Sequence, residues 1–142
     1  MKLTRILVAL CLVPGFALAR PLVTVMNGAE IAKECDAALA AAQQAVKTME
    51  AKPKSGAIFD EWNRLQIEVE DLAGPVYLLA NVHTDKATRD AGDACILKLT
   101  KFGTELFQNE KLYKRIQNVN TANAHQAMLK KDLMEGFADT GV

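Results

Sequence analysis

An apolar repeat between residues 58 and 79 constrains the fold of this 142-residue chain more than any other feature. Its apolar positions are spaced alternately by four and three residues: Ile58, Trp62, Leu65, Val69, Leu72, Val76 and Leu79. That spacing places the side chains on one narrow stripe of an α-helix, whereas a half-buried strand would alternate every second residue. Because such a helix gains most of its stability by packing its stripe against neighbours, the repeat predicts a bundle of helices.

Other segments have the same helical character. An alanine-rich segment at 28–51 begins with a capping-box pattern, formed by Asn27 just before it and Glu30 in its first turn. Its apolar stripe is Ile31, Cys35, Ala38, Leu39, Ala42, Val46 and Met49. A third helix is expected from a cap at Thr84 or Asp85 to residue 107, and shorter helices at 109–119 and 122–137. Gly74-Pro75 is expected to bend the helix at 58–80 without ending it. No strand pattern follows residue 27, so we predict an all-α antiparallel bundle of about five helices.

The first 19 residues have the features of a secretory signal peptide. Lys2 and Arg5 precede an apolar run at 6–16, and Ala17-Leu18-Ala19 fits the pattern that signal peptidase cleaves. The run is too short to span a bilayer comfortably, although an uncleaved anchor and a buried N-terminal helix are alternatives. We therefore expect a signal peptide at 1–19, a helical domain at 20–142, export to the periplasm or medium, and no membrane association after cleavage.

Charge and cysteines limit the function classes. Lysine plus arginine equal aspartate plus glutamate at 17 each, so no basic face predicts a nucleic-acid partner. Cleavage would leave Cys35 and Cys95, and an oxidising compartment would allow them to form a disulfide. Both residues also lie on apolar stripes, where unpaired cysteines pack as small hydrophobes, so the sequence leaves the pairing open.

Residues that could support catalysis are few. The two histidines, His83 and His125, are 42 positions apart, and no carboxylate pattern links them into a zinc site. His83 is expected to lie at a turn between helices, and His125 near the start of a surface helix. The acidic residues beside the 58–79 stripe are interpreted as a solvated face, and Tyr77 as a packing residue. We therefore expect no catalytic, cofactor-binding or metal-binding residue in this chain.

The clearest motif surrounds the junction at residues 81–85. The sequence resembles the N-terminal helical region of the thimet oligopeptidase and peptidyl-dipeptidase family of zinc metallopeptidases over five segments: Phe59-Asp60-Glu61-Trp62-Asn63, 70–83 with Asn81-Val82-His83 at its end, Asp85-Lys86-Ala87-Thr88-Arg89-Asp90-Ala91, Phe102-Gly103-Thr104-Glu105-Leu106 and Asn109-Glu110-Lys111-Leu112-Tyr113. Thr84 stands where that family commonly has proline, and threonine can cap a helix in its place.

The resemblance implies a helical wall that lines the substrate channel of a peptidase for short peptides. The family's zinc motif, His-Glu-x-x-His, does not occur in this sequence. The resemblance therefore implies that the chain is the non-catalytic N-terminal portion of an exported zinc oligopeptidase and is inactive alone. Such a portion would be a fragment, a truncated product or half of a split protein. Its partners would be a separate catalytic domain or short peptides. The alternative is a free-standing exported helical module that binds a peptide or a partner helix.

Overall fold

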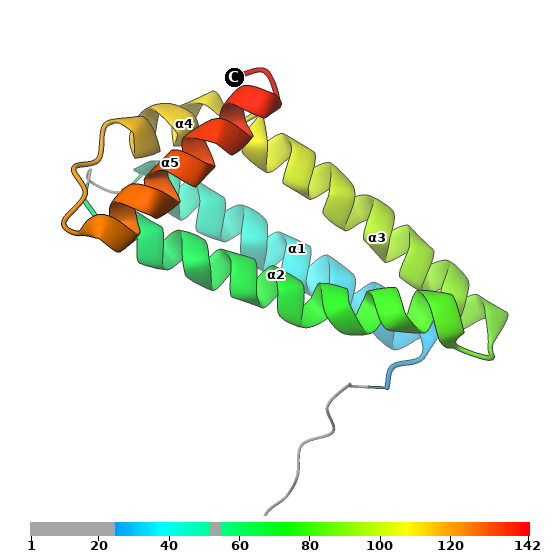
Figure 1. Ribbon diagram of the computed structural model, residues 1–142. Helices are drawn as coiled ribbons and strands as arrows, with labels where there is room; N and C mark the ends of the chain where they lie inside the picture. The colour runs from blue at the N-terminus through cyan, green and yellow to red at the C-terminus, as the bar shows by residue number, and fades with distance from the viewer. Residues whose placement is uncertain (1–24, 52–54) are drawn as a thin grey trace, which may run out of the picture.

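The computed structural model of the protein describes residues 25–51 and 55–142, which form five helices and no strand. The helices are α1 (Gly28–Ala51), α2 (Ala57–Val82), α3 (Lys86–Phe107), α4 (Glu110–Gln117) and α5 (Ala124–Asp139). Figure 1 shows the three long helices side by side, with α4 and α5 at one end. The predicted all-α bundle is therefore confirmed. The predicted signal peptide at 1–19 lies outside the described residues, and no described helix is both long and apolar enough to cross a bilayer.

Three pairs of contacts give the directions of the long helices. A Cβ atom on Gly92 would lie 2.8 Å from the Cβ atom of Ala80, so α3 returns antiparallel along α2 from their short junction. Cys35 is bonded to Cys95, and the side chain of Asn109, just after α3, donates to the Glu50 carboxylate near the end of α1. Since both ends of α1 meet the matching ends of α3, these two helices run parallel and α2 runs antiparallel to both.

Local capping interactions set the helix starts. Asn27 and Glu30 form the predicted capping box: the Asn27 N–H donates to Glu30 Oε2 at 2.8 Å, and the Glu30 N–H donates to Asn27 Oδ1 at 3.0 Å. Asp85, rather than Thr84, caps α3. The last helix begins at Ala124, two residues later than predicted, because the Asn123 side chain accepts from the N–H of Gln126 and caps it there.

The second helix remains one helix across Pro75, as predicted. In Figure 1 its ribbon slopes over the first half and levels off over the second, so the helix bends along its length. Its buried face is wider than the predicted stripe, since Phe59, Ala73 and Ala80 are also buried. The width follows from packing, because α2 contacts α1 on one side and α3 on the other.

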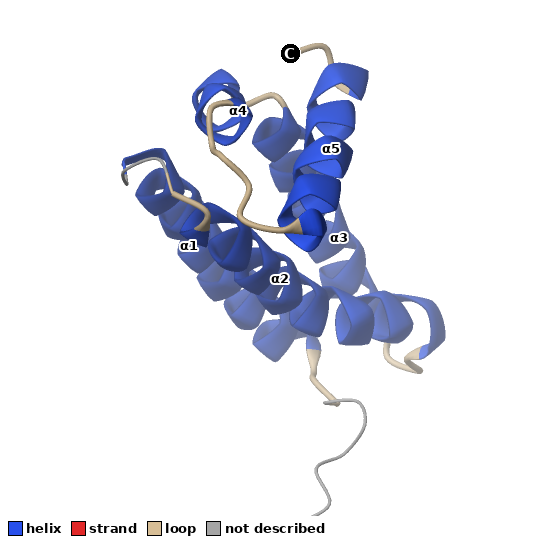
Figure 2. Cartoon of the chain, turned by 60° about the vertical axis from the view of Figure 1, so that its left-hand side comes forward, coloured by secondary structure: helices blue, strands red, loops and turns tan. Residues whose placement is uncertain are grey.

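The core consists of two apolar clusters along the bundle. One lies around the disulfide near the start of α1 and includes Ile31, Val76 and Leu99. The other lies at the opposite end, where α4 and α5 cover the long helices, as Figure 2 shows. Four aromatic rings meet there: Phe137 of α5 lies 5.4 Å from Phe107, 5.7 Å from Tyr113 and 6.4 Å from Trp62 between ring centroids. Both ends of the bundle therefore have their own packed core.

Candidate functional site

The two histidines lie at opposite ends of α2. His83 directly follows its last residue, whereas Gln126, next to His125, contacts Gly56 at its start. A helix of this length spans roughly 39 Å, so the two imidazoles do not form one site. Among the described residues, no group of three His, Cys, Asp or Glu side chains is positioned to hold a metal ion.

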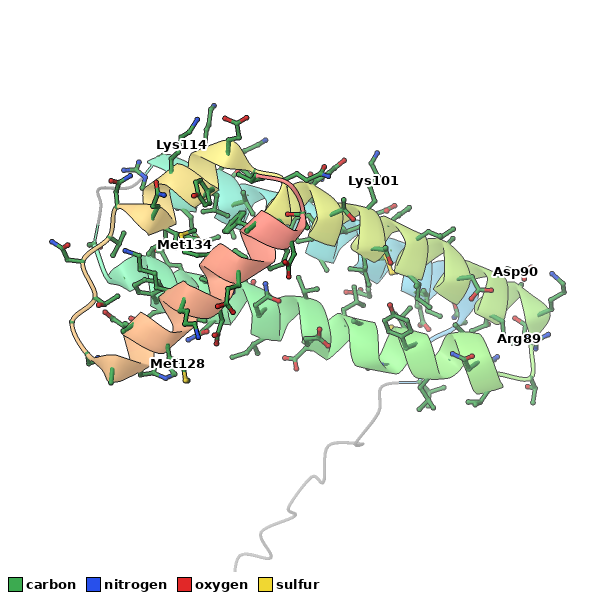
Figure 3. The ribbon with its side chains drawn as sticks, turned by 45° about the horizontal axis from the view of Figure 1, so that its top comes forward. Arg89, Asp90, Lys101, Lys114, Met128 and Met134 are labelled. Atoms are coloured by element: carbon green, nitrogen blue, oxygen red, sulfur yellow. A yellow bond between two sulfur atoms is a disulfide. The ribbon has the colours of Figure 1, made fainter. Side chains whose placement is uncertain are left out.

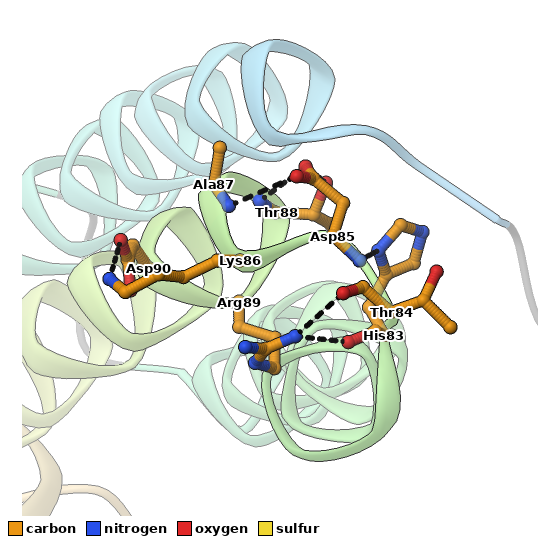
Figure 4. Close-up of polar contacts among 8 residues, drawn as sticks. All are labelled: His83, Thr84, Asp85, Lys86, Ala87, Thr88, Arg89 and Asp90. Atoms are coloured by element: carbon orange, nitrogen blue, oxygen red, sulfur yellow. Dashed lines mark hydrogen bonds and ion pairs between the residues drawn. The ribbon is translucent and has the colours of Figure 1, made fainter.

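The junction between α2 and α3 is a corner of the molecule that contains a group of hydrogen bonds among neighbouring residues (Figure 4). His83 Nδ1 accepts from the N–H of Asp85 at 3.1 Å. Arg89, one turn into α3, donates through Nη1 to the carbonyl oxygens of His83 at 2.7 Å and Thr84 at 3.0 Å. Arg89 thereby holds the turn against the helix that follows it, and His83 has the predicted structural position.

Asp85 organises the start of α3. Its carboxylate accepts from the N–H groups of Ala87 and Thr88 and, at 2.8 Å, from the Thr88 hydroxyl. The Thr88 hydroxyl bond, followed by the backbone bond from Thr88, lowers the pKa of Asp85 below the ordinary value of 3.8. Lys86 and Asp90 form an exposed ion pair at 2.6 Å on the next turn, on the right of Figure 3, where Asp90 is labelled. These bonds link the turn at residues 83–85 to the first turns of α3.

Apolar side chains lie exposed beside this corner. Leu78 and Val82 are 44% and 64% exposed, and Ile67, three turns earlier on the same side of α2, is also exposed. We call these three residues the outer face of α2. Tyr77, predicted as a packing residue, is 46% exposed, because it lies one position from the buried Val76 and is rotated about 100° away from the core. The outer face is a surface on which another protein could pack.

A groove runs between the first half of α1 and the middle of α2. Its volume is about 550 Å³. The apolar part of its lining, called the floor below, consists of Val25, Met26, Ala37, Ala38, Leu72 and Pro75. Four carboxylates line the groove: Glu30 and Glu34 from α1, and Glu68 and Asp71 from α2. None of the ten residues that line it is basic. Sequence reasoning assigned Glu68 and Asp71 to a solvated face; they are exposed, but they face the α1 carboxylates across a hollow.

No family model, curated protein or solved structure matches the chain. The described part of the chain presents a hydrogen-bonded corner between α2 and α3, an exposed apolar face beside it and an acidic groove on the α1–α2 side. The groove is the feature that sequence reasoning missed. The acidic residues on α1 and α2 were visible in the sequence, but only the packing of the two helices places them across from each other.

Proposed function

We propose that this chain is the non-catalytic, N-terminal helical portion of an exported zinc metallo-oligopeptidase-like protein that cleaves short peptides. The observation that carries the proposal is the α2–α3 corner. The residues that carry the resemblance, from Asn81 to Asp90, are the residues whose hydrogen bonds shape that corner. Asp85 and Arg89 hold the turn and the start of α3 through these bonds, so their presence fits a helical wall that takes no part in catalysis.

The surface beside the corner supports the same proposal. Leu78 and Val82 present apolar atoms to solvent at the end of α2, where a soluble helix would usually present polar ones. A channel wall needs such a surface, because it must pack against the portion that carries the zinc motif. The catalytic chemistry would then belong entirely to that second portion, whose residues would hold the zinc. This chain would form one wall of the substrate channel.

The disulfide supports export. Structural disulfides form and persist in oxidising compartments and are rare in the cytosol. Cys35 and Cys95 are bonded and are both buried, so the bond lies inside the packed bundle. This supports a location outside the cytoplasm, in agreement with the expected signal peptide.

The test is complementation. The purified chain is incubated with a quenched fluorogenic short peptide and zinc, alone and with a separately expressed catalytic portion of a thimet oligopeptidase-like enzyme. We expect no cleavage by the chain alone and a gain of cleavage on mixing. The double variant Leu78→Glu with Val82→Glu should abolish the gain. Leu97→Glu, on α3 at a position 71% exposed, introduces the same substitution once outside this face; it is the control and should preserve the gain.

Three outcomes would reject the proposal. The first is no gain of cleavage when the chain is mixed with the catalytic portion. Cleavage by the chain alone would require a catalytic site in this chain. An unchanged gain in the Leu78/Val82 variant would show that the outer face of α2 is not the surface that meets the catalytic portion.

A second candidate function is a free-standing helical module that binds a peptide or a partner helix. The observation that favours it is the groove between α1 and α2, which has an apolar floor and charged walls, the arrangement that peptide-binding grooves use for affinity and orientation. Direct peptide binding by the chain alone separates this candidate from the first, which requires a catalytic portion.

A further inference from the structure

We propose that the groove between α1 and α2 binds a short basic peptide segment with alternating apolar side chains. The inference deepens the second candidate function by naming its ligand class, and it does not depend on the oligopeptidase proposal. Its basis is the combination of a shaped apolar floor with walls of a single charge sign.

The floor selects for apolar side chains. Ala37 and Ala38 on α1 are small, so they leave space above the helix backbone, and Leu72 and Pro75 of α2 close the other side. The hollow follows about two turns of each helix, roughly 10 Å, which accommodates about three residues of an extended peptide. One or two apolar side chains of such a segment can reach the floor.

The walls select for cations. Within the described ranges 25–51 and 55–142, the carboxylates of Glu34, Glu68 and Asp71 take part in no ion pair. Glu30 uses one oxygen to cap α1 and retains its negative charge. Four carboxylates around one hollow, with no basic residue among the lining residues, make a negative potential that a lysine or arginine side chain would neutralise.

The surface between α1 and α3 does not have a single charge sign. On the α1–α3 side, Lys98 pairs with Asp36 at 2.6 Å, and Lys101 pairs with Glu105 at 3.7 Å, so the hollow there contains both charge signs. The α1–α2 groove is therefore the place where a basic ligand meets unopposed carboxylates. Its long axis also suits an extended segment better than a single ion.

The groove continues toward the start of α2. Glu68 also lines the next hollow along the same two helices, together with Arg64 and Glu61. Since Arg64 and Glu61 bring both charge signs to that hollow, the stretch lined by carboxylates alone is the one with Glu34 and Asp71. A bound segment should therefore place its basic residues toward Asp71 and Glu34.

The binding test uses a fluorescein-labelled hexapeptide in which lysine and leucine alternate, followed by fluorescence anisotropy with the purified, oxidised chain. Two reference peptides separate the contributions: one has glutamine in place of lysine, and the other has serine in place of leucine. We expect the lysine–leucine peptide to bind most tightly. Raising the salt from about 0.02 M to about 0.3 M should weaken it, since exposed ion pairs are screened.

Charge-neutral variants locate the site. Glu34→Gln with Asp71→Asn should weaken binding by about three- to tenfold, as expected for two exposed ion pairs. Asp93→Asn with Asp132→Asn removes the same charge from α3 and α5, outside the groove, and should leave binding unchanged. Ala37→Lys places a cation within the groove and should compete with the peptide, whereas Ala32→Lys adds the same charge to α1 outside the lining and should not.

Several outcomes would overturn the inference. Equal weakening by the groove pair and the control pair would show attraction to total charge alone. Equal binding of the leucine and serine peptides would remove the role of the floor. Self-association that is lost in the groove variants, with no peptide binding, would assign the groove to a second copy of the chain. Peptide binding with no complementation would retain this inference and reject only the oligopeptidase proposal.

Discussion

Cys35 on α1 and Cys95 on α3 are joined by a disulfide, with their Cα atoms 5.9 Å apart, although 60 positions separate them in the sequence. Both side chains lie inside the core cluster at the start of α1. The bond ties together the two parallel helices, which have no direct connection in the chain because α2 lies between them. It therefore holds the first and third helices in register while the middle helix supplies the antiparallel contacts.

Loss of this disulfide should destabilise the bundle. A crosslink across a loop of this length removes conformational freedom from the unfolded chain, so Cys35→Ala with Cys95→Ala should lower the free energy of unfolding by about 2–4 kcal/mol. Urea denaturation with and without a thiol reductant measures the effect, and the reductant should not alter the double variant. Peptide mapping without reduction should recover residues 35 and 95 in one linked species, and two separate peptides would contradict the structure.

Removal of the Asp85 charge should change how stability depends on pH. Hydrogen bonds from Thr88 lower the folded-state pKa of Asp85 below its ordinary value of 3.8. The ionised carboxylate therefore stabilises the fold fully above that ordinary value, and the contribution is lost as the pH falls through the lower folded-state pKa. The stability difference between the wild type and Asp85→Asn should be constant from neutral pH down to 3.8 and shrink below it.

Two further variants separate the cap from the charge. Asp85→Ala removes both and should be less stable than Asp85→Asn at neutral pH, since asparagine still caps a helix. Asp90→Asn breaks only the exposed ion pair with Lys86 and should leave the cap's contribution in place. Urea midpoints measured across the pH range test all three. A wild-type curve parallel to that of Asp85→Asn at every pH would contradict the assignment.

Two glycines on α3 should respond in opposite directions to alanine. A Cβ atom on Gly92 would lie 2.8 Å from the Ala80 Cβ and 3.1 Å from its Cα, so Gly92→Ala must push α2 and α3 apart and should cost about 1–3 kcal/mol. A Cβ atom on Gly103 meets nothing within 4 Å, so Gly103→Ala should stabilise the helix by about 0.5–1 kcal/mol. Thermal denaturation of the pair checks both signs, and destabilisation by Gly103→Ala would be the contrary result.

The aromatic cluster should hold α5 onto the long helices. Phe137 is fully buried among Phe107, Tyr113 and Trp62, and truncation of a buried phenylalanine costs about 3–5 kcal/mol. Phe137→Ala should therefore lower stability by that amount and shift the emission of Trp62, the chain's one tryptophan, toward the red as water reaches it. Met128→Ala, at an exposed position of the same helix, is the control and should change stability by less than about 0.5 kcal/mol.

Sequence reasoning succeeded where the determining interactions are local. The stripe from Ile58 to Leu79 and the capping box of Asn27 and Glu30 depend on residues one or two helical turns apart. The sequence left the cap of α3 open between Thr84 and Asp85, and the structure assigns it to Asp85. The predicted starts of α1 and α3 therefore agree with the structure. The start of α5 was placed two residues early, although the cap that sets it, Asn123 accepting from Gln126, is a local signal that was overlooked.

The remaining errors concern which neighbour a side chain meets. Tyr77 borders the buried stripe in sequence yet is exposed, because neither neighbouring helix covers its side of α2. Conversely, Ala73 and Ala80 lie outside the predicted stripe yet are buried, since α2 has two partner helices rather than one.

The sequence by itself determined the helical class, the position of each long helix and most of its inward face, because hydrophobic spacing and capping act over a few residues. Only the tertiary structure decided that Cys35 meets Cys95 and that Glu34 faces Asp71 across a groove. Those pairings depend on the rotation and register of one packed helix against another. Many such arrangements bury the same stripes, and the side chains of the whole bundle select among them together.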